Sequence, residues 1–200
     1  DIRAVALGDV VVADLDHVFH KLGEDWGEID FVVHSVAFAE REFLEVGNFH
    51  KTSRTAFNQA IEISAYSLIA MAQRARPLMK NGGSIVAMTY YGGEKVVPGY
   101  NVMGIAKAAL EHSARYLAYE LGEDQIRVNN ISGGPLKTLA ASAVGGIDEM
   151  FEHQEKKAPL KRNIDGDEVG KTACYLVSDW STAVTGETIH VDAGFSTVGL

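Results

Sequence analysis

Short apolar runs alternate along this chain with longer amphipathic stretches. Runs rich in β-branched and aromatic residues predict buried strands, and apolar positions spaced three and four residues apart predict helices. The predicted strands are residues 4–7, 29–34, 84–89, 126–131 and 188–191. The predicted helices are residues 15–22, 52–79, 102–121, 148–157 and 167–176, the first with Asp14 as N-cap and the third ending at Gly122. This alternation predicts an α/β fold with a doubly wound parallel sheet, and without a repeat or linker we expect residues 1–200 to form a single domain.

Composition narrows the possible partners and the compartment. The chain has 27 acidic and 18 basic residues, a net charge of −9, so we expect no binding to nucleic acid or to an anionic membrane. None of its apolar runs approaches the roughly 18 residues that predict a membrane span. Cys174 is the single cysteine, which favours a reducing, cytoplasmic setting, and its apolar neighbours predict an inert thiol in the core. The histidines show no ligand spacing, so we expect no metal site.

Tyr100 and Lys107 are the first candidates for chemistry. They are seven residues apart, about two turns of helix, and so share one helix face. A nearby ammonium group favours the phenolate, lowers the tyrosine pKa and makes the phenol a usable proton donor near neutral pH. The pair alone fits a solvated lysine beside a core tyrosine equally well.

The position of this pair in the predicted sheet supports the functional interpretation. Tyr100 follows the strand at 84–89, and two neighbouring strands end in the small-residue segments 35–37 and 132–135. Ligands of open α/β sheets bind beyond the carboxyl ends of the strands, where small residues let the backbone approach them closely.

These motifs together resemble the short-chain dehydrogenase/reductase superfamily, over essentially the whole chain. The Tyr100–Lys107 spacing is joined by Asn129-Asn130-Ile131 before Gly134-Pro135, and by Thr185-Gly186-Glu187 before Asp192-Ala193-Gly194. Finer features resemble the enoyl-acyl-carrier-protein reductases within it. Tyr90 and Tyr100 bracket residues 92–98, residues 35–39 read Ser-Val-Ala-Phe-Ala, and residues 138–142 read Thr-Leu-Ala-Ala-Ser. Ala87 also stands where other superfamily members carry a catalytic serine.

The resemblance implies a Rossmann-type fold and hydride transfer from a nicotinamide cofactor to C3 of a trans-2-enoyl thioester carried on acyl carrier protein. Tyr100 would donate to the thioester oxygen, Lys107 would hold the nicotinamide ribose, and Tyr90 would contact the substrate. The implied cofactor contacts are Asp9, Val10, Ser35, Val36, Ala37, Lys107, Pro135, Leu136, Thr138, Leu139 and Ala140, with NADH expected rather than NADPH. The implied substrate contacts are Ala39, Tyr90, Tyr100, Met103, Val144 and Ile147.

From the residues alone, several of these positions have ordinary structural explanations. Met103 fits a plain core position, Asp9 fits a turn, and Tyr90 and Tyr91, being adjacent, should face opposite ways. The resemblance also implies a homotetramer that pairs the helices at 52–79 and 102–121.

One feature of the resembling family has no counterpart in this chain. The family begins with a strand, a glycine-containing turn and a helix that hold the pyrophosphate, whereas residues 1–10 here already resemble its third strand. We therefore expect the C-terminal two-thirds or more of the fold, an exposed edge on the strand at 29–34, and weak cofactor binding by the 200 residues alone. The residue that separates NADH from NADPH would also lie in the absent segment.

Two other functions stay open at this point. A carbonyl-reducing dehydrogenase is disfavoured by Ala87, and a non-catalytic interaction module is disfavoured by the intact Tyr90, Tyr100 and Lys107. The surface that would receive acyl carrier protein is open as well. Residues 147–150 are acidic where the family often has basic residues, and the basic candidates further on are Lys156, Lys157, Lys161 and Arg162.

Overall fold

A single parallel sheet organises the computed structural model, which describes residues 14–136 and 147–199. Its strands are β1 (Phe31–His34), β2 (Gly83–Thr89), β3 (Ile126–Gly133) and β4 (Thr188–Val191), in the spatial order β1-β2-β3-β4. All three neighbouring pairs are parallel, as predicted. The predicted strand at 4–7 lies outside the described residues.

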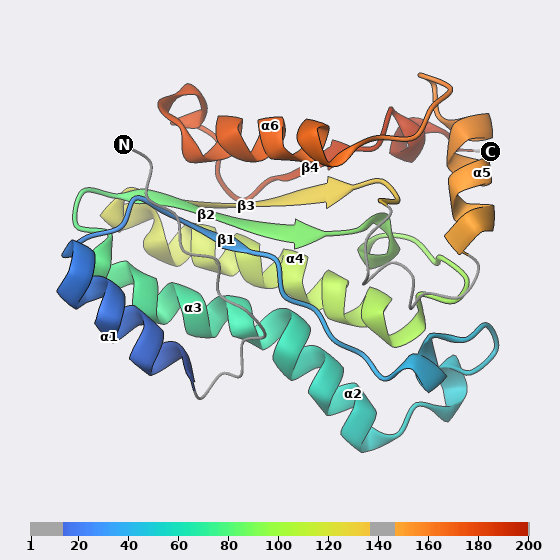
Figure 1. The fold of residues 1–200 in the computed structure, drawn as a ribbon, viewed down its shortest axis with the longest axis horizontal. Helices are drawn as coiled ribbons and strands as arrows, with labels where there is room; N and C mark the ends of the chain where they lie inside the picture. The colour runs from blue at the N-terminus through green and yellow to red at the C-terminus, as the bar shows by residue number, and fades with distance from the viewer. Residues whose placement is uncertain (1–13, 137–146, 200) are drawn as a thin grey trace.

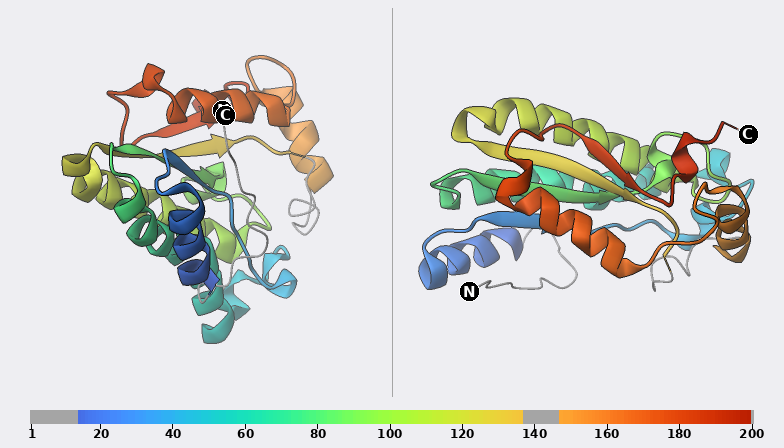
Figure 2. Two further views of the ribbon diagram at one scale, coloured as in Figure 1. Left: turned by 60° about the vertical axis from the view of Figure 1, so that its left-hand side comes forward. Right: turned by 90° about the horizontal axis from the view of Figure 1, so that it is seen from above.

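Helices cover both faces of the sheet (Figure 1). Helices α1 (Leu15–Trp26), α3 (Ser67–Ala75) and α4 (Asn101–Leu121) lie on one face, and α6 (Gly166–Val177) lies on the other. Helix α5 (Ile147–Lys157) stands beyond the carboxyl ends of the strands, as Figure 2 also shows. The predicted doubly wound, three-layer α/β fold is therefore confirmed.

The predicted helix at 52–79 is confirmed as a continuous helical rod from residue 54 to residue 78, although an unpredicted π turn interrupts its α-helical part. Helix α2 (Arg54–Ile61) begins after Ser53, whose side chain accepts a hydrogen bond from the Ala56 N–H. A π-helical turn, Glu62–Tyr66, follows before α3, and a 3-10 turn, Arg76–Leu78, ends the rod. Such π turns frequently occur at functional sites, and this one turns the buried side chain of Ser64 toward the loop after β1.

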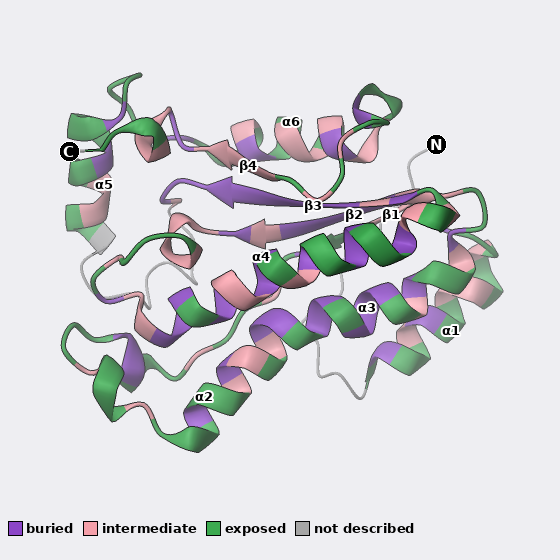
Figure 3. Ribbon diagram, turned by 180° about the vertical axis from the view of Figure 1, so that it is seen from behind, coloured by how far each residue is buried: buried purple, intermediate pink, exposed green. Residues whose placement is uncertain are grey.

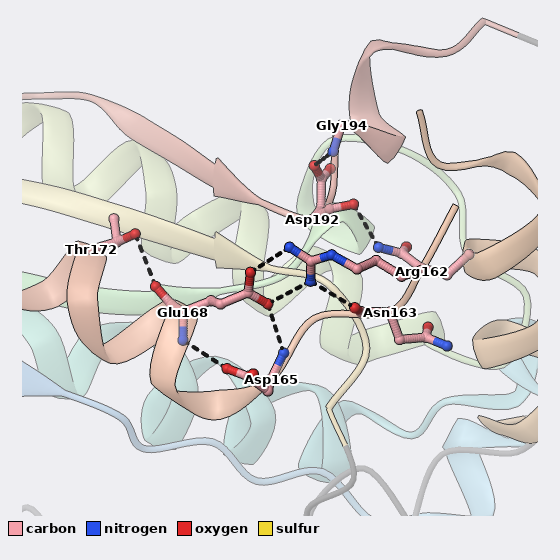
Figure 4. A network of polar contacts seen from close by, with 8 residues as sticks. Arg162, Asn163, Asp165, Glu168, Thr172, Asp192 and Gly194 are labelled. Carbon is pink, nitrogen blue, oxygen red and sulfur yellow. Dashed lines mark hydrogen bonds and ion pairs between the residues drawn. The ribbon is translucent and has the colours of Figure 1, made fainter. Parts of the chain in front are cut away.

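The other helix ends match the predictions more closely. Asp14 is the N-cap of α1, but its side chain makes no capping hydrogen bond, and Gly122 follows α4 as expected. Helix α6 has a capping box that the sequence analysis missed, in which Asp165 and Glu168 satisfy each other's backbone N–H groups (Figure 4). Arg162 donates to both oxygens of the Glu168 carboxylate, at 2.6 and 2.8 Å, and braces the same turn.

The core lies around the two central strands, where Figure 3 shows β3 almost entirely buried. Leu15, Leu68 and Leu110, from α1, α3 and α4, pack on one face of the sheet against strand residues such as Ile85 of β2. The buried Asn129 holds the start of β4, since its side chain donates to the Val184 carbonyl and accepts from the Glu187 N–H. The neighbouring Asn130 donates to the Thr188 hydroxyl at 3.2 Å, so both amide side chains join β3 to the segment of β4.

Cys174 is exposed, so its predicted place in the core is wrong. The apolar run around it lies on α6, where Leu176 is fully buried against the sheet. A residue two positions away on a helix faces the opposite side, and Cys174 therefore points to solvent. None of the helices in residues 14–136 and 147–199 is long and apolar enough to cross a membrane.

Gly104 is where α4 packs most closely on the loop after β2. A Cβ atom built there would lie 2.7 Å from the Gly92 carbonyl oxygen, which is too close for any real contact. We predict that Gly104→Ala lowers the free energy of unfolding by about 1–3 kcal/mol, measured by urea denaturation, because α4 must move away from the loop.

Gly170→Ala is the matched control on α6. A Cβ at Gly170 meets nothing within 4 Å, so alanine there should stabilise the protein by about 0.5–1 kcal/mol through helix propensity. Equal effects of the two alanines would contradict the close contact between α4 and the loop.

Candidate functional site

The parallel order of the strands brings the predicted site segments to one edge of the sheet. His34 pairs with Ala87 near the end of β1, and Thr89 pairs with Ser132 near the end of β3. The segments that follow β1, β2 and β3 therefore emerge side by side. This confirms that they lie together at the carboxyl ends of the strands, and that they form one binding site stays a prediction.

Tyr90 and Tyr100 are in direct contact at this edge. Their ring centroids are 4.9 Å apart, with the planes at 68°. Gly92 packs against the Tyr100 ring so closely that no Cβ would fit there. Tyr91 instead contacts the rings of His190 and Phe195, so the adjacent tyrosines do face different ways, as predicted.

Tyr100 precedes α4 rather than lying within it. Asn101, the first residue of the helix, has a φ of +43°, a left-handed conformation that an asparagine tolerates. Its side-chain amide donates to the carbonyls of Phe43 and Glu45, at 2.9 and 2.8 Å. These bonds fix the direction in which the helix leaves Tyr100.

Lys107 is buried beneath this edge, with 6% of its surface exposed. Its ammonium group donates a 2.8 Å hydrogen bond to the Met88 carbonyl in β2. Burial lowers the pKa of Lys107 to about 8, although the nearby Glu111 favours the charged form. The ammonium group has three donors, and among the described residues only Met88 accepts from it.

The predicted lowering of the Tyr100 pKa is wrong in this structure. Burial raises the pKa of Tyr100 above its usual value, and the acidic groups of Tyr90 and Glu111 raise it further. The sequence argument considered the lysine charge and left out the desolvation of the phenol, which is the larger effect here. At neutral pH, Tyr100 is a protonated donor.

The loop after β1 is held by serines from the interrupted helix. The Ser64 hydroxyl accepts from the Phe38 N–H at 2.9 Å and donates to the Phe38 carbonyl at 3.1 Å, as a neighbouring strand would. The Ser67 hydroxyl donates to Ile63 and contacts the His34 ring nitrogen Nε2 at 2.7 Å. Ser35 and Ala37 remain exposed, so their backbone groups are free to receive a ligand.

A cavity of about 640 Å³ adjoins Tyr90, whereas Tyr100 lines a separate cavity of about 340 Å³. Tyr90, Val97, Pro98, Pro135, Met150 and Phe195 are among the residues that line it. The Tyr90 hydroxyl also makes a long contact of 3.9 Å with the Met150 sulfur, so α5 closes the cavity beside Tyr90. A largely apolar wall next to a phenol suits a ligand with a hydrocarbon chain and one polar group.

The structure places the other predicted residues as follows. Ala39 and Tyr100 pack against a buried cluster that contains Met103, which is 7% exposed. Val36 packs against the main core, and Leu136 packs on the opposite face of the sheet. Asp9, Val10, Thr138, Leu139, Ala140 and Val144 lie outside the described residues, and of Ile147 only its place at the start of α5 is described.

Four polar residues of the site were missed by the sequence analysis. His34, Ser64, Ser67 and Glu111 are all at least 96% buried. Their position could have been predicted from the sequence, because each is a polar residue that interrupts the apolar face of a predicted strand or helix. In the described residues no group of three or more histidine, cysteine or acidic side chains is arranged to bind a metal.

Ser64 offers a test of the anchored loop. Ser64→Ala should lower the free energy of unfolding by about 1–3 kcal/mol and speed hydrogen exchange at the Phe38 amide, since both backbone groups of Phe38 lose their partner. Ser113→Ala is the control, because no hydrogen bond of its side chain occurs in the described structure. Unchanged exchange at Phe38 would contradict the anchor.

His34 predicts a pH dependence of stability. Burial lowers its pKa from 6.5 to about 4, with a further contribution from the Lys107 charge. Above pH 6.5 the His34 ring is neutral in both the folded and the unfolded protein. Between pH 6.5 and 4 the ring is protonated in the unfolded chain but stays neutral in the folded protein. Stability should therefore fall by about 3 kcal/mol between pH 6.5 and 4, at about 1.4 kcal/mol per pKa unit. Urea denaturation of His34→Asn should show a smaller loss, and an equal loss would contradict the assignment.

Known proteins are similar in sequence to this chain over nearly its whole length. Residues 8–196 match the family model described as enoyl-(acyl carrier protein) reductase. The chain is 53% identical to the NADH enoyl-acyl-carrier-protein reductase FabI of Synechocystis over 94% of its own length and 72% of that protein. It is 56% identical to the NADPH enzyme of Staphylococcus aureus over 90% of its own length and 70% of that protein.

Solved structures agree with the sequence comparison. The enoyl-acyl-carrier-protein reductase of Anaplasma phagocytophilum, in complex with NAD, superposes with a TM-score of 0.90 at 49% identity, covering 94% of this chain and 73% of that one. The Bacillus cereus enzyme, with NADP⁺ and an indole naphthyridinone, gives 0.92 at 47% identity, covering 95% and 74%. The chain belongs to the enoyl-acyl-carrier-protein reductase family.

Proposed function

We propose that this protein reduces the trans-2 double bond of an enoyl thioester carried on acyl carrier protein, with a nicotinamide cofactor as hydride donor. The observation that carries the proposal is the contact of Tyr90, at the wall of an apolar cavity, with Tyr100, which precedes the helix that carries the buried Lys107, in a member of this family. This is the last reductive step of a fatty acid elongation cycle. The family comparisons favour it over a carbonyl-reducing or non-catalytic role.

The described residues fit a dinucleotide. Lys107 has two donors to spare at the carboxyl end of β2, and the exposed backbone of Ser35 and Ala37 lies on the neighbouring strand. Lys107 would hold the nicotinamide ribose hydroxyls, while Ser35, Val36, Ala37, Pro135 and Leu136 would contact the cofactor. Asp9, Val10, Thr138, Leu139 and Ala140 would complete that surface.

Tyr100 would act on the substrate oxygen. A bound nicotinamide would supply the hydride for C3 of the enoyl group, negative charge would develop on the thioester oxygen, and a proton from water would complete the reduction at C2. Because its pKa is raised, Tyr100 keeps its proton at neutral pH and donates a hydrogen bond to that oxygen. The Lys107 ammonium adds positive potential, and Tyr90 contacts the substrate at the wall of the cavity.

The acyl chain would occupy the cavity beside Tyr90. Met150 and Pro135 already line it, and we propose that Ala39, Met103, Val144 and Ile147 border the bound chain. The carrier protein is acidic, so it requires basic residues near this entrance. Arg162 and Lys156 pair with Glu168 and Glu152. Lys161 donates to the Lys156 carbonyl, so Lys157 and Lys161 are the cations of this group that have no acidic partner among the described residues.

We propose NADH as the donor. The relatives from Synechocystis and Rhizobium meliloti are named as NADH enzymes, whereas that from Staphylococcus aureus is named as an NADPH enzyme. The test below therefore uses both cofactors.

We further propose a single-domain, cytoplasmic protein that assembles as a homotetramer. Phe57, Tyr66, Ile105, Tyr116 and Tyr119 expose at least 38% of their surface on α2, the π turn and α4, which supports helix pairing between copies. The net charge of −9 supports the absence of nucleic-acid partners and of an anionic membrane partner.

Turnover tests the proposal. The protein expressed from its complete gene should oxidise NADH faster than NADPH with a trans-2-enoyl thioester. Tyr100→Phe should lower kcat by about 100-fold or more, since one oxyanion donor is typically worth that much. Tyr116→Phe, an exposed tyrosine of α4, is the control and should be fully active.

No turnover with either cofactor from a folded protein would refute the reductase assignment. Turnover of a 3-oxoacyl substrate instead would move the protein to the carbonyl-reducing class.

A further inference from the structure

Glu111 is a buried acidic residue that the proposed mechanism does not use. It lies on α4 one helical turn after Lys107, and only 4% of its surface is exposed. A buried carboxyl group is costly unless it is hydrogen-bonded or compensated by an opposite charge. Its position therefore calls for a physical explanation.

The contacts of Glu111 tie it to the same strand end as Lys107. The Thr89 hydroxyl, itself 93% buried, donates to the Glu111 carboxylate at 2.6 Å. Thr89 is the neighbour in β2 of Met88, whose carbonyl accepts from Lys107. The acidic and the basic side chain of α4 thus hold consecutive residues of one strand.

The loop after β2 closes over the carboxylate. A Cβ atom built on Gly93 would lie 2.6 Å from the Glu111 oxygen Oε1, so only glycine allows the loop to approach this closely. The loop also carries Tyr90 and leads to Tyr100. Glu111 therefore lies beneath the segment that connects the two tyrosines and is screened by it from solvent.

The surrounding charges are few. Burial raises the pKa of Glu111, whereas the hydrogen bond from Thr89 lowers it. Glu94 from the loop, Arg115 from α4 and His190 from β4 also face Glu111, and Glu94 pairs with His190 at 2.7 Å. Lys107 is faced by His34 from β1 as well as by Glu111. Among these described groups, Glu111 is the acidic side chain that favours the charged form of Lys107.

We propose that Glu111 is a positioning residue for the reduction, whose buried carboxylate, held by Thr89, keeps the Lys107 ammonium charged where it meets the cofactor. The inference rests on the proposed function, because it assigns Glu111 a task within the same site. Glu111 acts through Lys107 and does not itself touch the substrate. Without it, burial alone would favour a neutral amine, which binds ribose hydroxyls less firmly and gives no positive potential.

The test is the pH dependence of Glu111→Gln in the full protein. Glutamine keeps an oxygen that accepts from Thr89 but removes the charge. The alkaline limb of the kcat/KM profile should move to lower pH by roughly one unit, as expected for loss of a nearby opposite charge. Glu111→Asp should restore part of the shift. Glu120→Gln, an exposed position of α4, is the matched control and should leave the profile unchanged.

Cofactor binding separates Lys107 from Tyr100, because loss of Glu111 also lowers the Tyr100 pKa. In a Tyr100→Phe background, NADH binding should weaken as the pH is raised. With Glu111→Gln added, this rise in the dissociation constant should begin at a lower pH. If Glu111→Gln does not fold, the paired change Thr89→Val with Glu111→Met replaces both partners by apolar groups and should give the same shift.

Profiles and dissociation constants that coincide with those of Glu120→Gln would overturn the role of Glu111. An inactive wild-type protein would refute the proposed function instead, while the NADH titration would still test the inference.

Discussion

The hydrogen bond from Lys107 to the Met88 carbonyl joins α4 to the carboxyl end of β2, and the site is arranged around it. The bond fixes an ammonium group under the strand end while leaving donors available above it. Tyr100 directly precedes α4, whose first residue, Asn101, is anchored by hydrogen bonds. The loop between the tyrosines packs on α4 where Gly92 of the loop meets Gly104 of the helix. Helix, strand and loop are therefore one rigid unit, which is what a preorganised donor to a developing charge requires.

The helical rod at residues 54–78 holds the loop that follows the neighbouring strand, β1. Ser64 replaces the missing edge partner of the loop after β1, so this short segment has a defined conformation although no strand lies beside it in the described structure. Among the described strands none pairs with the outer edge of β1, and Val33 of β1 is 44% exposed. The backbone that would face a dinucleotide is thus positioned by side chains from α2 and α3.

Much of this architecture follows from the sequence. Strand runs and helix periodicity predicted the parallel sheet and both helical layers, and the Tyr100–Lys107 spacing with its strand-end context pointed to the site. The π turn was not predictable, because Ser64 and Ser67 act through bonds to a loop distant in sequence. The Tyr100 pKa was misjudged because desolvation depends on packing. Cys174 was misplaced because its apolar neighbours spread around the helix, and only one side of it is buried.

Isotope transfer tests the central claim most directly. A trans-2-enoyl thioester would be reduced with NADH carrying two deuterium atoms at C4 of the nicotinamide, and the product examined by NMR and mass spectrometry. Our account predicts one deuterium, located at C3 of the saturated thioester. Deuterium at a carbonyl-derived carbon of a 3-oxoacyl substrate, with none transferred to the enoyl thioester, would contradict it.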